Sequence, residues 1–322
     1  MVLNILVGDI GGTHSRLAQA RVAGQHVSLV DVQRYRNAHH SSLTGILTEY
    51  LRKHAYHPRS ACLAVAGSTD GRQVHFTNLD WHVHADALAR ELGMERVSLV
   101  NDFSAVGWGL DALQTRDLCF LQTGPGEAEG VRVAVGAGTG LGVSLCVPQR
   151  GRYRPLSSEG GHMGFAPQDD EQDRLLQFLR GLHGRVSVER VVSGPGIVDL
   201  YRFCAREAGL GEPPLLAQTE PPQAISQAAQ VGGDPVALRT MQLFVRIYGQ
   251  IAGDVALLAR ARGGVFLAGG IASKNLPLMQ APEFLAGFHA KGRFSAWMRE
   301  IPVAVVLDAD IGLRGAALAA AT

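Results

Sequence analysis

The stretch VSLVND, residues 97–102, joins a short apolar run to an amide and a carboxylate. The apolar run predicts a buried strand, and in open α/β folds ligands bind beyond the carboxyl ends of such strands. A carboxylate there, Asp102, can accept a proton from a substrate hydroxyl, and the neighbouring amide of Asn101 can orient that hydroxyl. The alternative is a turn in which both side chains serve only local backbone hydrogen bonds.

Two glycine-rich turns, at 11–13 and 138–140, each separate two strand-like segments. Turns of this kind expose several backbone N–H groups, which form nests for phosphate oxygens. The hydroxyls of Thr13 and Thr139 can add donors, and Asp9, just before the first turn, can hold a hydrated Mg²⁺ against those phosphates. The alternative is a pair of ordinary hairpins. The sequence contains neither a P-loop nor a dinucleotide-binding glycine motif.

A third group of polar residues lies further along the chain. Glu159 and His162 flank two glycines, which predicts a loop pressed close to a small ligand whose hydroxyls these side chains contact. Glu189 is a further candidate for the same role, against the alternative of a solvated surface charge. Metal ligation by Glu159 and His162, or by His82 and His84, has little support because no third ligand lies nearby.

Composition limits the possible partners. The chain has 322 residues, with Lys+Arg 30 and Asp+Glu 29 and a formal net charge of +1. This balance gives no basic surface for nucleic acid, but it does not exclude a small anionic ligand. Length alone favours about two domains.

The four cysteines and the N-terminus both favour a cytoplasmic location. None of the cysteines forms a Cys-x-x-Cys pair, and three lie in apolar strand-like runs, so we expect reduced core residues. No segment is apolar enough over its length to span a bilayer, and the N-terminus lacks a basic region. We therefore expect a cytoplasmic protein without membrane contact.

The order of predicted elements is that of an α/β fold. Strands alternate with helices through the first third, including a helix at 43–54, a strand at 61–66 and a helix at 85–92. A second strand–glycine turn–strand unit at 132–147 resembles the first and suggests an internal duplication. The proline-rich segment 211–222 predicts an exposed loop, and a long helix then runs to Ala259.

Seven motifs occur in an order that resembles the bacterial ATP-dependent glucokinases of the hexokinase–actin–Hsp70 superfamily. Any one of them is modest support, but the ordered set covers essentially the whole chain. They are DIGGT (9–13), LVNDF (99–103), GTGLG (138–142), SEGGH (158–162), ERVVSG (189–194), LAGGI (267–271) and KGRF (291–294).

The resemblance implies the fold, the substrates and the role of each matching residue. It implies a two-domain actin-like ATPase (ribonuclease H-like) fold, with a small α/β domain at 1–110 completed by 301–322, and a larger α+β domain at 111–300, around a cleft. It implies ATP-dependent phosphorylation of D-glucose to glucose 6-phosphate, with Mg²⁺, in a homodimer. Asp102 matches the catalytic base. The sugar-binding positions are Asn101, Asp102, Gly140, Glu159, His162 and Glu189; the nucleotide side has Asp9, Gly11, Gly12, Thr13, Gly138, Thr139, Gly269 and Gly270.

Two positions depart from the family pattern. His14 replaces a common Asn after the first glycine turn, and Ser68 replaces a common Pro. Neither departure removes a proposed catalytic group. A related kinase of mannose or an amino sugar, one that uses polyphosphate, a sugar sensor without activity and an actin-like ATPase are the alternatives. The sensor is disfavoured by the missing DNA-binding extension, and the ATPase would not need Glu159, His162 and Glu189 together.

Overall fold

The computed structural model of the chain describes residues 2–67, 69–76 and 81–322. Its contacts divide the chain into two compact units. Unit 1 comprises Met1–Thr115, Cys146–Ser157 and Asp308–Thr322, and unit 2 comprises Arg116–Leu145 and Ser158–Leu307. Ser68, one of the two departures from the family pattern, lies outside the described residues.

Unit 1 is built on a five-stranded sheet in the order β3-β2-β1-β4-β7. Its strands are β1 (Leu3–Ile10), β2 (His14–Ala23), β3 (His26–Arg36), β4 (Ser60–Val65) and β7 (Arg96–Asn101), and a separate pair consists of β5 (Gln73–His75) and β6 (His82–His84). Its helices are α1 (Leu43–Lys53), α2 (Ala85–Glu91), α3 (Asp102–Gly109) and α12 (Ile311–Ala320).

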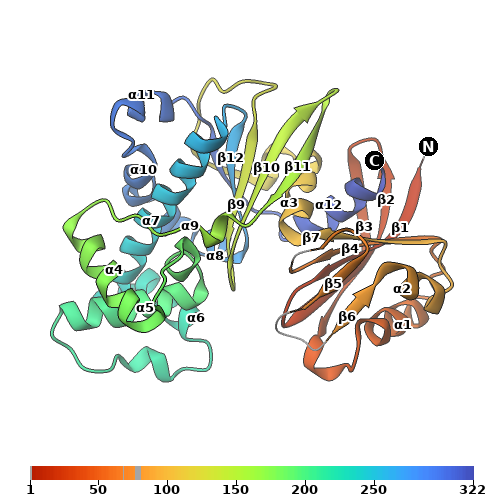
Figure 1. Cartoon of the computed structure of the whole chain (residues 1–322), viewed down its shortest axis with the longest axis horizontal. Coiled ribbons are helices and arrows are strands. Elements are labelled where there is room, and N and C mark those ends of the chain that lie inside the picture. The colour runs from red at the N-terminus through yellow and green to blue at the C-terminus, as the bar shows by residue number, and fades with distance from the viewer. Residues whose placement is uncertain (1, 68, 77–80) are drawn as a thin grey trace. The chain divides into compact units, whose positions relative to one another are not determined.

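Helices cover both faces of this sheet, and β1 shows how one strand serves both (Figure 1). Side chains alternate across a strand, so Ile5 and Val7 point to one face and Leu6 to the other. Ile5 and Val7 belong to a buried cluster with Leu313 of α12, whereas Leu6 belongs to one with Ile46 of α1. The last helix of the chain therefore completes the core around its first strand.

Unit 2 contains a six-stranded sheet in the order β11-β10-β9-β12-β13-β8. The strands are β8 (Leu118–Gln122), β9 (Arg132–Ala137), β10 (Leu141–Gln149), β11 (Arg152–Ser158), β12 (Gly264–Ala268) and β13 (Val303–Val306). β10 and β11 continue from this unit into unit 1. The helices are α4 (Asp170–His183), α5 (Gly194–Glu207), α6 (Pro221–Val231), α7 (Pro235–Ala259), α8 (Gly270–Lys274), α9 (Leu276–Met279), α10 (Pro282–His289) and α11 (Ser295–Met298).

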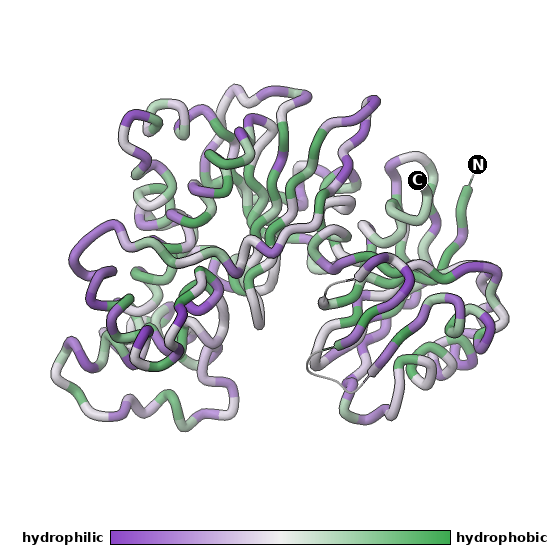
Figure 2. The backbone as a smooth tube through the Cα atoms, viewed as in Figure 1, coloured by the Kyte–Doolittle hydropathy of each residue, from purple (hydrophilic) through white to green (hydrophobic). Residues whose placement is uncertain are grey.

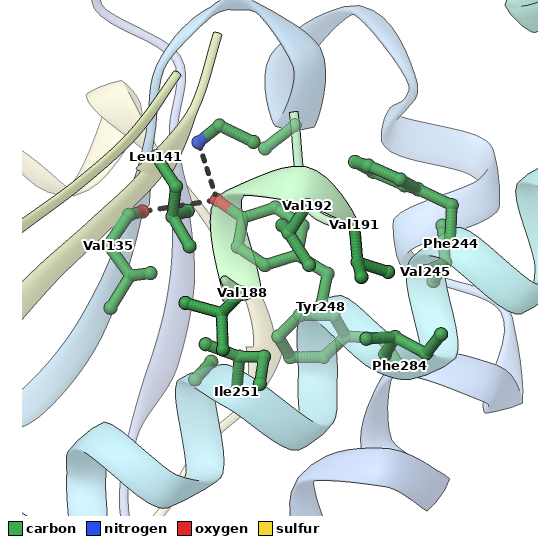
Figure 3. Close-up of a cluster of buried hydrophobic side chains, with 14 of the residues drawn as sticks. Val135, Leu141, Val188, Val191, Val192, Phe244, Val245, Tyr248, Ile251 and Phe284 are labelled. Carbon is green, nitrogen blue, oxygen red and sulfur yellow. Dashed lines mark hydrogen bonds between the residues drawn. The ribbon is translucent and has the colours of Figure 1, made fainter. Parts of the chain in front are cut away.

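The long helix α7 is the centre of the unit 2 core. Asp234 caps it by accepting hydrogen bonds from the amides of Val236 and Ala237, and Pro235 occupies its first turn. Phe244, Tyr248 and Ile251 on α7 pack with valines of β9 and of the segment 186–192 (Figure 3). Hydrophobic residues also concentrate along the strands of both sheets (Figure 2). This packing fixes the strands from which the candidate site residues project.

Most of the predicted elements are confirmed, including the two glycine hairpins, the helices near 43–54 and 85–92 and the long helix ending at Ala259. The loop expected at 211–222 is partly wrong, because a 3-10 turn forms at Pro214–Ala217 and α6 begins at Pro221. Proline fixes φ near the helical value and lacks only an N–H that the first turn leaves unpaired, so it starts this helix. The predicted domain boundaries at 110 and 300 stay a prediction.

Candidate functional site

The carboxyl ends of three parallel strands bring the predicted residues of unit 1 to one sheet edge. In the register of β1, β4 and β7, Ile10 lies opposite Val65, and Val65 lies opposite Asn101. Asp9 therefore comes one residue before the edge of the sheet, and Asp102 follows at the first position of α3. This is the edge where ligands bind in open α/β sheets.

The Asn101 side chain holds both the start of α3 and the Asp102 carboxylate. Its Oδ1 accepts a hydrogen bond from the Ser104 amide at 3.0 Å, which makes Asn101 the N-cap. Its Nδ2 donates to the Gly67 carbonyl at 3.2 Å and to Asp102 Oδ1 at 3.1 Å. The Phe103 amide donates to the same Asp102 oxygen at 2.8 Å. Two donors on Oδ1 thus fix the direction of a partly exposed carboxylate.

The glycine turn at 11–13 is supported by Asn37, a residue that the sequence did not single out. Asn37 is 1% exposed; its Nδ2 donates to the Gly11 carbonyl at 2.8 Å and its amide donates to the Thr13 carbonyl at 3.0 Å. Its Oδ1 accepts from the buried Ser15 hydroxyl at 2.8 Å. No local pattern marks Asn37 in the sequence, because its partners lie more than 20 residues away.

Asp9 is paired with Arg16, a second residue that the sequence analysis missed. Arg16 Nη2 lies 2.6 Å from Asp9 Oδ2, and its Nη1 reaches the Ala309 carbonyl at 2.6 Å and Asp310 Oδ1 at 3.0 Å. Asp9 and Arg16 are directly opposite in the β1–β2 hairpin, so counting outward from the glycine turn would have found this pair.

The few potential ligands around Asp9 limit how this residue can bind Mg²⁺. One carboxylate already bound by a guanidinium is not a cage for a bare cation, and the described residues include no group of three or more potential ligands. Mg²⁺ keeps most of its water and is usually held by one or two carboxylates and the substrate phosphates. A single carboxylate of this kind fits the predicted contact of Asp9 with Mg²⁺ through water.

In unit 2, the glycine turn at 138–140 follows a strand end anchored by Tyr248. The Tyr248 hydroxyl donates to the Val135 carbonyl at 3.1 Å and accepts from the Ala137 amide at 3.3 Å (Figure 3). Complete burial raises the pKa of this hydroxyl, so it remains a neutral hydrogen-bonding group. The turn itself is closed by a bond from the Gly138 amide to the Gly140 carbonyl at 2.8 Å.

The predicted glycines 269 and 270 lie beside this strand end. Ala268 of β12 is opposite Gly136 of β9, so the segment after β12 leaves the sheet at the same edge. Gly269 has a φ of +87°, and a Cβ there would lie 2.8 Å from the Ala137 carbonyl oxygen. Only glycine fits this position, and the structure brings the two predicted phosphate-side segments of unit 2 together.

Glu189 contacts the same turn. Its Oε2 accepts a hydrogen bond from the Leu141 amide at 2.9 Å, and a Cβ at Gly140 would lie 2.5 Å from that oxygen. Glu189 belongs to the 3-10 turn Val188–Arg190 and is partly buried. It is therefore no isolated surface charge.

The loop of Glu159 and His162 lies against the first residues of β10. A Cβ on Gly161 would lie 2.2 Å from the Leu141 carbonyl oxygen, so the loop can approach β10 only with glycine. The His162 amide donates to the Glu159 carbonyl at 2.9 Å, and both side chains are exposed. Leu141 thus contacts both loops and brings Gly140, Glu159, His162 and Glu189 into one region of unit 2.

Comparison with known proteins supports the family resemblance that the sequence motifs indicate. A profile of the glucokinase family matches residues 6–322. The glucokinase of Trichormus variabilis is 39% identical over 337 residues, covering 98% of this chain and 98% of the relative. That of Caulobacter vibrioides is 41% identical over 317 residues, covering 98% and 94%. A crystal structure of glucokinase from an Antarctic psychrotroph is similar with a TM-score of 0.85 and 32% identity, covering 98% of each chain. The predicted two-domain fold class and the family resemblance are confirmed.

Proposed function

Since this chain belongs to the glucokinase family, we propose that it transfers the γ-phosphoryl group of ATP to the 6-hydroxyl of D-glucose. The product is glucose 6-phosphate, and the reaction is the first step of glycolysis. The observation that carries the proposal is the Asn101–Asp102 pair at the carboxyl edge of the unit 1 sheet. A carboxylate there, held by an amide, is the group that a hydroxyl nucleophile needs.

Asp102 is the general base in this proposal. It accepts the proton of the 6-hydroxyl as the oxygen attacks phosphorus, while Asn101 orients both the carboxylate and the sugar. Because phosphoryl transfer needs little covalent chemistry from the protein, positioning and charge stabilisation account for most of the catalysis. The two hydrogen bonds that fix Asp102 Oδ1 therefore serve the reaction by positioning the base.

The remaining predicted residues divide into a sugar group and a phosphate group. Glu159, His162 and Glu189, with the backbone at Gly140, accept and donate hydrogen bonds to the sugar hydroxyls. The backbone N–H groups of the two glycine turns, the hydroxyls of Thr13 and Thr139 and the segment at 269–270 bind the ATP phosphates. Mg²⁺, when bound, neutralises charge on those phosphates, with Asp9 holding it through water.

Two further properties belong to the proposal. Assembly as a homodimer is expected from the family resemblance, and a cytoplasmic location is expected from the cysteines and from the lack of a membrane-spanning segment in the sequence. Among the described residues, no helix is both long enough and apolar enough to cross a membrane.

The experiment is a coupled assay of the purified protein with ATP, Mg²⁺ and a panel of sugars. We expect glucose to give the highest kcat/KM and the Glu159→Ala variant to lose about 10- to 100-fold of it, since each charge-assisted hydrogen bond contributes about 1.5–3 kcal/mol. The KM for ATP should barely change. A higher kcat/KM with mannose or an amino sugar, or faster turnover of glucose when polyphosphate replaces ATP, would indicate a related kinase. No turnover with any sugar would contradict the proposal.

A further inference from the structure

A cavity of about 510 Å³ lies within unit 1, apart from the sheet edge that carries Asp102. It is formed by the β10–β11 turn, the last turn of α3, the end of β7 and the end of α12. Its size suits a small organic molecule. The lining residues are Val100, Trp108, Gln149, Arg150, Arg152, Tyr153, Arg154, Ala319 and Thr322.

The charge of this cavity is one-sided. Arg150, Arg152 and Arg154 line it, and no carboxylate side chain does, although the chain as a whole is almost neutral. Arg152 and Arg154 are two residues apart on β11, so their side chains leave the same face of the strand. In the part of the chain that the structure describes, none of the three guanidinium groups forms an ion pair or hydrogen bond, whereas Arg16, Arg262 and Arg314 each do.

The remaining lining gives the cavity an apolar side. Trp108 and Val100 are partly buried against the core of α3, α12 and β1. An aromatic and aliphatic wall facing unpaired guanidinium groups suits a ligand with a planar apolar part and a phosphate. Guanidinium binds phosphate through paired N–H donors, and the bonds are charge-assisted.

We propose that this cavity binds a small phosphate ester, with the phosphate on Arg152 and Arg154 and the apolar part against Trp108. The site is distinct from the candidate substrate site, because none of its lining residues is among the predicted sugar or nucleotide contacts. The bound molecule contacts the strand and the helix that carry Asn101 and Asp102, through Val100 and Trp108.

The test is a calorimetric titration of the full chain with phenyl phosphate, which combines a ring and a phosphate. Glucose and a non-hydrolysable ATP analogue are present, so that the candidate substrate site is occupied. We expect saturable binding, weakened at least about tenfold in the double variant R152Q/R154Q because two charge-assisted contacts are lost. Binding should also weaken with added salt.

A matched control separates this site from general attraction of anions. The double variant R21Q/R34Q removes the same charge from exposed arginines on β2 and β3 of the same unit and should bind as the wild type does. Trp108→Leu should weaken phenyl phosphate more than inorganic phosphate. Absence of saturable binding, equal affinity in R152Q/R154Q, or equal weakening by R21Q/R34Q would each overturn the proposal. None of these results depends on which sugar the enzyme phosphorylates.

Discussion

The two glycine turns, one in each unit, each connect two strands, but different interactions support them. The turn at 11–13 in unit 1 is held by polar side chains, since Asn37 bonds to both of its ends and Arg16 binds the neighbouring Asp9. Around the turn at 138–140 in unit 2, glycines of two other segments approach the backbone closely, Gly161 at Leu141 and Gly269 at Ala137. The side chains of Glu189 and Tyr248 add hydrogen bonds at the strand ends.

This difference predicts how each half responds to substitution. A turn that depends on side-chain hydrogen bonds fails when a buried polar partner is removed, because the remaining groups stay unpaired. A turn that depends on close approach fails when a methyl group is added, because backbone atoms cannot give way. Both units contain a strand–glycine turn–strand segment, as expected, but the interactions around the two turns differ. The internal duplication stays a prediction.

The largest expected effect is that of Asp102→Asn in unit 1. The amide keeps the shape of the side chain but cannot accept a proton, so kcat should fall by about 10²- to 10⁴-fold while glucose binding is largely retained. Steady-state kinetics and a glucose titration measure the two quantities. Asp86→Asn, an exposed change in α2 of the same unit, is the control. A kcat near that of the wild type across the pH range would exclude Asp102 as the base.

Gly161→Ala tests the dependence of unit 2 on close approach. The added methyl group would lie 2.2 Å from the Leu141 carbonyl oxygen, so the loop of Glu159 and His162 must move. We expect a loss of about 10- to 100-fold in kcat/KM for glucose and a lower free energy of unfolding by about 1–3 kcal/mol. Gly164→Ala, where a Cβ meets nothing within 4 Å, should change neither. Equal behaviour of the two variants would refute the close-approach account.

Asn37→Ala tests the dependence of unit 1 on side chains. The buried Ser15 hydroxyl and the Gly11 carbonyl each lose a partner, so the free energy of unfolding should fall by about 1–3 kcal/mol. The KM for ATP should rise several-fold because the turn at 11–13 loses its support. Chemical denaturation and kinetics measure both, with the exposed Asn4→Ala as control. If the KM for ATP stays unchanged in a destabilised variant, the turn is not a nucleotide contact.

The smallest expected effect is a difference in stability between the two units, measured by the labelling of one buried thiol in each. Burial raises the pKa of Cys62 in unit 1 to about 12, and it also raises the pKa of Cys204 in unit 2. Neither thiol should react with an alkylating reagent at pH 8, because the reactive thiolate is scarce and inaccessible. In rising urea we expect Cys62 to be labelled before Cys204, since unit 2 has the larger core. Peptide mass spectrometry gives the order, and simultaneous labelling would indicate that the units unfold together.

Local pattern predicted the strands and the turns, but not what supports them. The hairpins, the strand before Asn101 and the long helix capped at Asp234 each follow from residues a few positions apart. The bonds of Asn37 and the packing of Gly161 against Leu141 join segments about 20 or more residues apart. Such contacts depend on how strands pair, and one sequence without relatives carries no direct signal for them.

Arg16 and Glu189 differ in how far their contacts could be predicted from the sequence. The pairing of Arg16 with Asp9 could have been predicted from the hairpin register alone. The contact of Glu189 with Leu141 could not, because it joins a 3-10 turn to a strand 48 residues earlier. The pattern therefore identified Glu189 as a candidate but left its structural role unspecified.

The position of α12 determines when unit 1 can finish folding. Leu313, Ala316 and Ala317 cover one face of the sheet whose centre is β1, so the core around Ile5 and Val7 stays open until residues 311–320 are synthesised. Until the last helix is made, the apolar face of the unit 1 sheet that it covers stays exposed and can contact neighbouring chains. Unit 2, which ends at Leu307, is complete sooner. The part of the chain that is made first therefore depends, for its core, on the part that is made last.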